Sequence, residues 1–105
     1  MALARKPTHS RITVQNYTSL GHVMQVDAVK YKAMRVAMMT ALPRKKPGLT
    51  AAEMREQVLA LLPDEVFPGG KTAGWWMKCV QLDLEAKRVI ERDPKAKPLR
   101  WHRLK

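Results

Sequence analysis

Prolines and glycines divide the middle of the chain into three segments that have the length and apolar periodicity of amphipathic helices. Asp27 is a typical N-cap before the first segment. Thr50 and Glu53 have the spacing of a capping box at the start of the second. A chain of 105 residues is long enough for one domain with one modest core. We expect helices over residues 27–42, 50–62 and 71–86.

Short β-type runs flank this helical part. Ile12 and Val14 alternate with polar residues, and a turn of polar residues and glycine separates them from a second run. Val89 and Ile90 follow the third helix in a strand, and a turn rich in proline and lysine precedes a returning strand. The predicted fold class is therefore α+β, in a single domain over residues 11–105. We expect a hairpin over residues 11–26, a second hairpin over residues 88–104, and a flexible basic arm over residues 1–10.

The formal net charge of +11 is concentrated at the two ends of the chain. The net charge is +8 over residues 1–46, −3 over residues 47–86 and +6 over residues 87–105. Such a balance favours polyanionic partners, which are nucleic acids, anionic membrane surfaces or acidic proteins. The basic runs are not interleaved with exposed aromatic residues at helical spacing, so no membrane partner is expected.

The sequence lacks the features of membrane-spanning, secreted and disulfide-bonded proteins. No window holds a run of about 20 apolar residues, and the first residues turn basic before an apolar stretch forms. Cys79 is the single cysteine, which excludes an intramolecular disulfide and is typical of a reducing compartment. We therefore expect a cytoplasmic protein.

No constellation of side chains indicates catalysis or metal binding. His9, His22 and His102 are far apart in sequence, and Cys79 lies among apolar neighbours, where an inert thiol is usual. The run Gly69-Gly70-Lys71-Thr72 ends like a P-loop but lacks the upstream glycine of that motif. We expect a protein that is not an enzyme and has no cofactor and no metal, and the sequence identifies no small-molecule substrate.

The junction between the third helix and the second hairpin resembles the winged helix-turn-helix family. Its residues are Leu82-Asp83-Leu84-Glu85-Ala86-Lys87 at the helix end and Arg88-Val89-Ile90-Glu91-Arg92 in the strand. In this family a recognition helix often runs into an apolar strand that forms the first arm of the wing. The resemblance covers residues 27–105. It implies that the third helix and the wing contact nucleic acid.

More narrowly, the chain is similar to a family of small, uncharacterised bacterial proteins. These proteins share a Pro-Gly-Leu-Thr helix start, a Phe-Pro-Gly-Gly linker, a Gly-Trp-Trp third helix and a Pro-Leu-Arg-Trp-His-Arg tail. The matching segments here are Pro47–Thr50, Phe67–Gly70, Gly74–Trp76 and Pro98–Arg103. This resemblance supports the fold and implies no activity.

The leading hypothesis is that the chain binds double-stranded DNA, mainly through the phosphate backbone. On the third helix, Lys71 and Lys78 are placed to meet phosphates or guanine edges, and Gln81 to read adenine. Glu85 on the same face would repel phosphate. Each phosphate contact releases counterions and so contributes to affinity. The alternative interpretation is that these charges form a solvated surface that keeps the protein soluble. The other candidates are Arg88, Arg92, Lys95, Lys97, Arg100 and Arg103 in the wing, Arg44, Lys45 and Lys46 in a loop, and Arg5, Lys6 and Arg11 near the N-terminus.

A second hypothesis is a protein-interaction or dimerisation module that uses Trp75, Cys79 and Leu82. These residues form an apolar stripe on the third helix, turned away from the expected core, and such a stripe needs a cover. The cover is either the N-terminal hairpin, which we favour slightly, or a second subunit. Stacking of Trp75 on a nucleic-acid base is a weaker option. We expect Trp76 in the core and Trp101 as the anchor of the wing strand.

Overall fold

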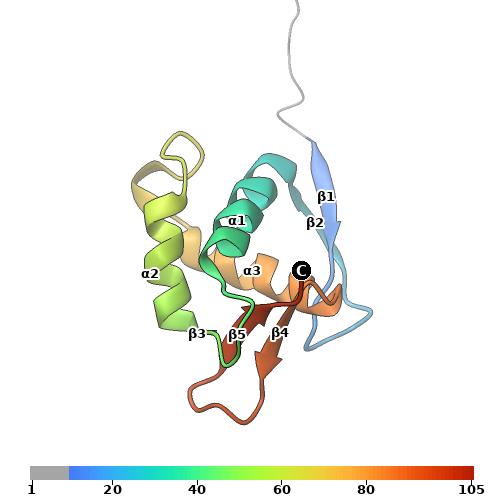
Figure 1. Ribbon diagram of the computed structural model, residues 1–105. Helices are drawn as coiled ribbons and strands as arrows, with labels where there is room; N and C mark the ends of the chain where they lie inside the picture. Colours follow the sequence, from blue (N-terminus) through green and yellow to red (C-terminus); the bar gives the residue numbers. More distant parts are fainter. Residues whose placement is uncertain (1–9) are drawn as a thin grey trace, which may run out of the picture.

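The structure is a computed structural model that describes residues 10–105. Three helices and two small antiparallel sheets confirm the α+β fold class (Figure 1). The expected N-terminal arm falls almost entirely outside the described residues. In chain order the elements are β1 (Arg11–Val14), β2 (Met24–Asp27), α1 (Ala28–Ala41), β3 (Leu49–Thr50), α2 (Ala51–Leu61), the 3₁₀ turn η1 (Pro68–Gly70), α3 (Ala73–Ala86), β4 (Ile90–Asp93) and β5 (Arg100–Arg103).

The helices begin where the sequence places their capping residues. The Asp27 side chain accepts hydrogen bonds from the backbone N–H groups of Val29 and Lys30 at the start of α1. Thr50 and Glu53 form the predicted capping box of α2. Thr72 is different, because its backbone is left-handed (φ +62°) and its hydroxyl donates to the carbonyl of Lys71 instead of capping α3. Helix α3 therefore starts at Ala73, later than the expected residue 71.

A two-residue strand, β3, is the element that the sequence patterns do not show. It lies between α1 and α2 and pairs with β5, so the sheet has the order β3-β5-β4 with antiparallel neighbours. Leu49 lies opposite Trp101 in this pairing. The N-terminal strands form a separate two-stranded sheet, β1-β2, and α1 lies between this sheet and α2 (Figure 1).

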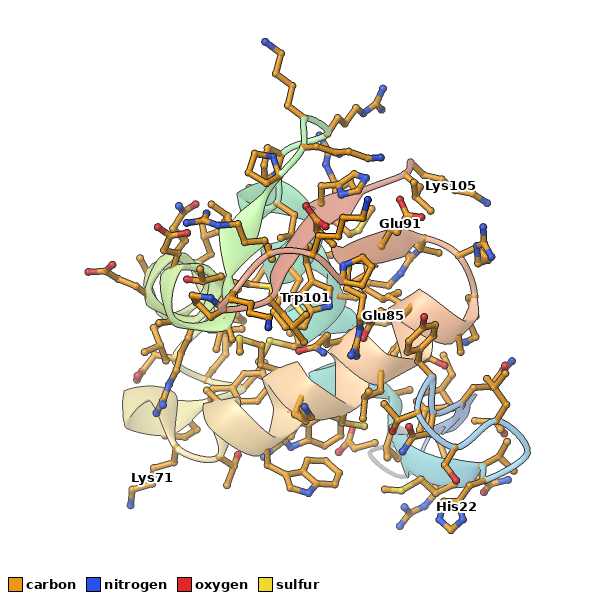
Figure 2. The ribbon with its side chains drawn as sticks, turned by 90° about the horizontal axis from the view of Figure 1, so that it is seen from below. His22, Lys71, Glu85, Glu91, Trp101 and Lys105 are labelled. Atoms are coloured by element: carbon orange, nitrogen blue, oxygen red, sulfur yellow. The ribbon has the colours of Figure 1, made fainter. Side chains whose placement is uncertain are left out.

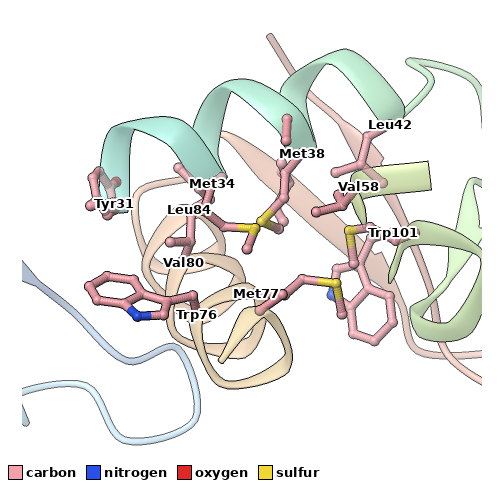
Figure 3. Close-up of a cluster of buried hydrophobic side chains, with 14 of the residues drawn as sticks. Tyr31, Met34, Met38, Leu42, Val58, Trp76, Met77, Val80, Leu84 and Trp101 are labelled. Atoms are coloured by element: carbon pink, nitrogen blue, oxygen red, sulfur yellow. The ribbon is translucent and has the colours of Figure 1, made fainter. Parts of the chain in front are cut away.

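The core lies where α1 crosses α3, with α2 and the three-stranded sheet closing it (Figure 3). Met34, Met38 and Leu84 are fully buried, and Val58 of α2 reaches the same cluster. Trp101 of β5 is also buried. Burial of this apolar surface supplies most of the driving force for folding.

Gly48 fixes how closely the loop after α1 approaches the sheet. Its φ of +88° lies in the left-handed region, and a Cβ atom there would overlap the carbonyl group of Trp101. Only glycine satisfies both constraints. Across the described residues, no helix is long and apolar enough to cross a membrane.

Candidate nucleic-acid interface

Most of the carboxylates are engaged in contacts inside the fold. Asp83 on α3 is the most buried of them, and its side chain accepts hydrogen bonds from the Tyr31 hydroxyl, the backbone N–H of Gln15 and the Lys87 ammonium. Because these partners lie in α1, directly after β1 and directly after α3, Asp83 joins these three segments. The other engaged carboxylates are Asp27, Glu53, Asp64, Glu85, Glu91 and Asp93.

Gln81 and Glu85, expected on the solvent face of the third helix, lie inside the protein. Gln81 is 2% exposed and donates to the Glu85 carboxylate, and Glu85 accepts two hydrogen bonds from the Arg92 guanidinium on β4. The three-stranded sheet packs on this face of α3. Helix periodicity does not reveal this contact, so it predicts exposure at positions that the sheet buries. Gln81 therefore has no free path to a base edge in this conformation, and the expected solvent placement of both residues is wrong.

Several candidate arginines also hold the fold together. Arg100 donates to the carbonyl of Gly48 and lies 3.3 Å from the Glu53 carboxylate. The Arg103 guanidinium donates to the carbonyl of Leu42, and Arg44 donates to the carbonyl of Lys105. Together with Arg92, these side chains serve structure, and the charges of Arg92 and Arg100 are already compensated by carboxylates.

Four lysines in two loops remain as exposed cations. Lys45 and Lys46 lie in the loop that leads into β3, and Lys95 and Lys97 lie in the loop that joins β4 to β5 (Figure 1). None of the ion pairs found within residues 10–105 involves these four, which we call the loop lysines. Arg88, directly after α3, is exposed as well.

Lys71, just before α3, and Lys78 on α3 belong to a different surface. Lys71 and Lys78 are exposed, and Figure 2 shows Lys71 and His22 on the side of the molecule opposite Lys105. Arg44, which donates to the Lys105 carbonyl, lies near the other end of that view. The candidate residues therefore do not form one continuous interface. Arg11 is exposed on β1, and Arg5 and Lys6 lie outside the described residues.

The N-terminal hairpin packs on α3 and covers part of its apolar stripe. The backbone N–H of Tyr17 donates to the carbonyl of Leu82, and the Arg92 guanidinium lies 4.8 Å from the centre of the Tyr17 ring. Cys79 and Leu82 are half-buried in consequence, whereas Trp75 remains 53% exposed. The predicted cover is thus present over one end of the stripe only. Burial raises the pKa of the Cys79 thiol, and the nearby Asp83 carboxylate adds to this shift. The thiol is therefore neutral and contributes to the apolar surface of the stripe.

Sequence reasoning did not identify Asp83, Gln15 and Tyr17 as the residues that fasten the hairpin. The one available signal was an acidic side chain between Leu82 and Leu84 in an apolar stretch of α3. Within residues 10–105, no group of three or more histidine, cysteine, aspartate or glutamate residues is arranged to hold a metal ion.

Residues 11–101 match the model of one protein family, described as a family of unknown function (DUF6958). The chain belongs to this family. The matched range includes the hairpin, all three helices and most of the three-stranded sheet, so the match extends over nearly all of the described residues. No curated protein and no solved structure is significantly similar to the chain.

Proposed function

We propose that this chain is a winged-helix protein of the cytoplasm that binds double-stranded DNA without acting as an enzyme. Its contacts are mainly with the phosphate backbone and are made by the loop lysines, with Arg88 beside them. In this proposal β4 and β5 are the two arms of the wing, and α3 is the helix that precedes it. The order of three helices and a final hairpin supports the assignment, although a fold does not determine a function.

The observation that carries the proposal is that most acidic side chains make contacts within the fold, whereas the loop lysines make no ion pair within residues 10–105. Most carboxylates are engaged in helix caps, other hydrogen bonds or ion pairs, whereas the loop lysines are exposed. The positive charges of these lysines are therefore not offset by an ion pair within residues 10–105. A flexible cationic side chain suits a phosphate, and backbone contacts require no base-reading residue such as the buried Gln81.

The proposal is tested by fluorescence anisotropy with a labelled random-sequence duplex. We expect a dissociation constant on the order of micromolar in low salt. With about four phosphate contacts, affinity should fall roughly a hundredfold when salt is raised fourfold. Absence of binding in low salt would contradict the proposal, and so would an affinity that salt leaves unchanged.

A second candidate function is a protein-interaction or dimerisation module, and the exposure of Trp75 favours it. The Trp75 ring is 53% exposed although it packs edge-on against Trp76, with 5.1 Å between the ring centres. Trp75→Glu should therefore leave the fold intact, as checked by circular dichroism. If the face is an interface, this variant loses a dimer or a partner complex in sedimentation or pull-down measurements, and Lys71→Glu, at an exposed residue just before the same helix, is the control. An unfolded Trp75→Glu variant would show that the ring belongs to the core.

A further inference from the structure

A cavity of about 200 Å³ lies between the N-terminal hairpin and α3. Its walls are mostly apolar and come from Val14 and Met24 of the hairpin and from Trp75, Cys79 and Leu82 of α3. Concave, mainly apolar sites with a few polar groups are the usual form of small-molecule sites. The cavity therefore offers a reason for the partly exposed Trp75 that requires no protein partner.

The cavity is held open by contacts that do not themselves fill it. The backbone N–H of Gln15 donates to Asp83 over 2.8 Å, and the backbone N–H of Tyr17 donates to the carbonyl of Leu82. The ring of Tyr17 lies under the Arg92 guanidinium, which is itself fixed by Glu85. The hairpin is thus fastened to α3 at the wall of the cavity itself, through Gln15 and Leu82, and the site is formed before any ligand arrives.

The polar side chains that line the cavity are those of Gln15, Asn16, His22 and Lys78. Lys78 contributes an ammonium group and His22 an imidazole. The Asn16 side-chain oxygen already accepts from the backbone N–H and hydroxyl of Thr18, which leaves its NH₂ group to donate. No carboxylate lines this cavity. The charge complementarity of the site is therefore to an anion.

We propose that this cavity binds a small amphipathic carboxylate, with its aryl or alkyl body against Trp75, Leu82 and Met24 and its carboxylate at Lys78. The volume suits one ring or a short chain and is too small for a long acyl chain. A carboxylate at Lys78 gains a charge-assisted hydrogen bond, and the apolar body gains burial. This site goes beyond the nucleic-acid proposal, since none of the loop lysines lines it.

The probe for this proposal is 3-phenylpropionate, followed by NMR titration of the isotope-labelled full chain. 3-Phenylpropanamide keeps the ring but lacks the charge, so it measures what the charge contributes. Propionate keeps the charge but lacks the ring, so it measures what the ring contributes. We expect saturable shifts at Val14, Met24, Cys79 and Leu82 for 3-phenylpropionate. The amide should bind more weakly by on the order of tenfold, because it lacks the charge-assisted bond.

Lys78→Met should reduce the affinity for 3-phenylpropionate to that of the amide and leave the amide itself unaffected. Lys71→Met, an exposed lysine of the same region that does not line the cavity, is the control. Several outcomes would overturn the proposal. They are shifts spread over the loop lysines as for any anion, no saturable shift, or a dimer in sedimentation whose interface covers Trp75 and excludes the probe. Nucleic-acid binding is read out separately, so failure of one proposal is distinguishable from failure of the other.

Discussion

The Tyr31 hydroxyl of α1 donates a hydrogen bond to the Asp83 carboxylate of α3, and both side chains are buried. The same carboxylate holds the N-terminal hairpin through Gln15. This bond therefore links the helical core to the wall of the Trp75 cavity. Loss of this bond should lower the free energy of unfolding and change how that free energy depends on pH in alkali.

Tyr31→Phe should lower the free energy of unfolding by about 1.5–3 kcal/mol, the usual contribution of a hydrogen bond to a charged group. The phenyl ring keeps the packing of the tyrosine, so the measured difference reports the bond. Urea denaturation followed by tryptophan fluorescence measures it. A difference near zero would contradict a net contribution of this hydrogen bond to stability.

The same residue predicts a loss of stability in alkali. Burial, followed by the hydrogen bond to Asp83, raises the pKa of Tyr31 well above its ordinary value of 10.0. Above pH 10 the unfolded chain releases the tyrosine proton while the folded chain keeps it, so this contribution to stability falls by about 1.4 kcal/mol per pH unit. Below pH 10 the contribution is constant. Denaturation curves of wild type and Tyr31→Phe should therefore converge as pH rises above 10, and parallel pH profiles would contradict this assignment.

The Arg92–Glu85 pair predicts a large effect on stability. The Glu85 side chain is 1% exposed, and Arg92→Met leaves its carboxylate without a charged partner, although the Gln81 amide still donates to it. Breaking a buried pair in this way should cost about 3–5 kcal/mol. Lys95→Met in the exposed turn is the control and should change stability by less than about 0.5 kcal/mol. The double variant Glu85→Leu with Arg92→Met should recover part of the loss, and chemical denaturation of the four proteins checks this order.

Gly48 and Gly21 provide a matched comparison of backbone strain and close contact. Both have positive φ angles, of +88° and +97°, but a Cβ atom at Gly21 would meet no atom within 4 Å. Gly21→Ala should therefore cost about 1 kcal/mol, from backbone conformation alone. Gly48→Ala must also displace the carbonyl of Trp101 and should cost at least about 3 kcal/mol or prevent folding. Equal thermal stabilities of the two variants would show that the loop before β3 is free to move away from β5.

The sequence predicts the helices and hairpins well because their signals are local. Asp27, Thr50 and Glu53 cap the helices through contacts within a few residues, and the same residues are visible in the sequence. Strand β3 has only two residues, too few for an alternating pattern, and it exists because Leu49 and Thr50 pair with β5.

The candidate site was less predictable because its exposure depends on tertiary contacts. Helix periodicity places Gln81 opposite the core stripe, yet the sheet that carries Arg92 covers it. The stripe of Trp75, Cys79 and Leu82 and its cover by the N-terminal hairpin were predicted, but not that the cover is incomplete and leaves a cavity against the stripe. Each of these features depends on how elements distant in sequence pack together.

The central claim, that the loop lysines contact DNA phosphates, is tested most directly by the salt dependence of duplex binding. One variant changes Lys45, Lys46, Lys95 and Lys97 to glutamine, and a control of equal net charge changes Lys32, Arg55, Lys71 and Lys78 to glutamine. The slope of log affinity against log salt should become shallower by about 3 to 4 in the first variant and stay close to the wild-type value in the second. An equal loss in both variants would show that net charge alone attracts DNA, and a larger loss in the second would place DNA on the other face of the molecule.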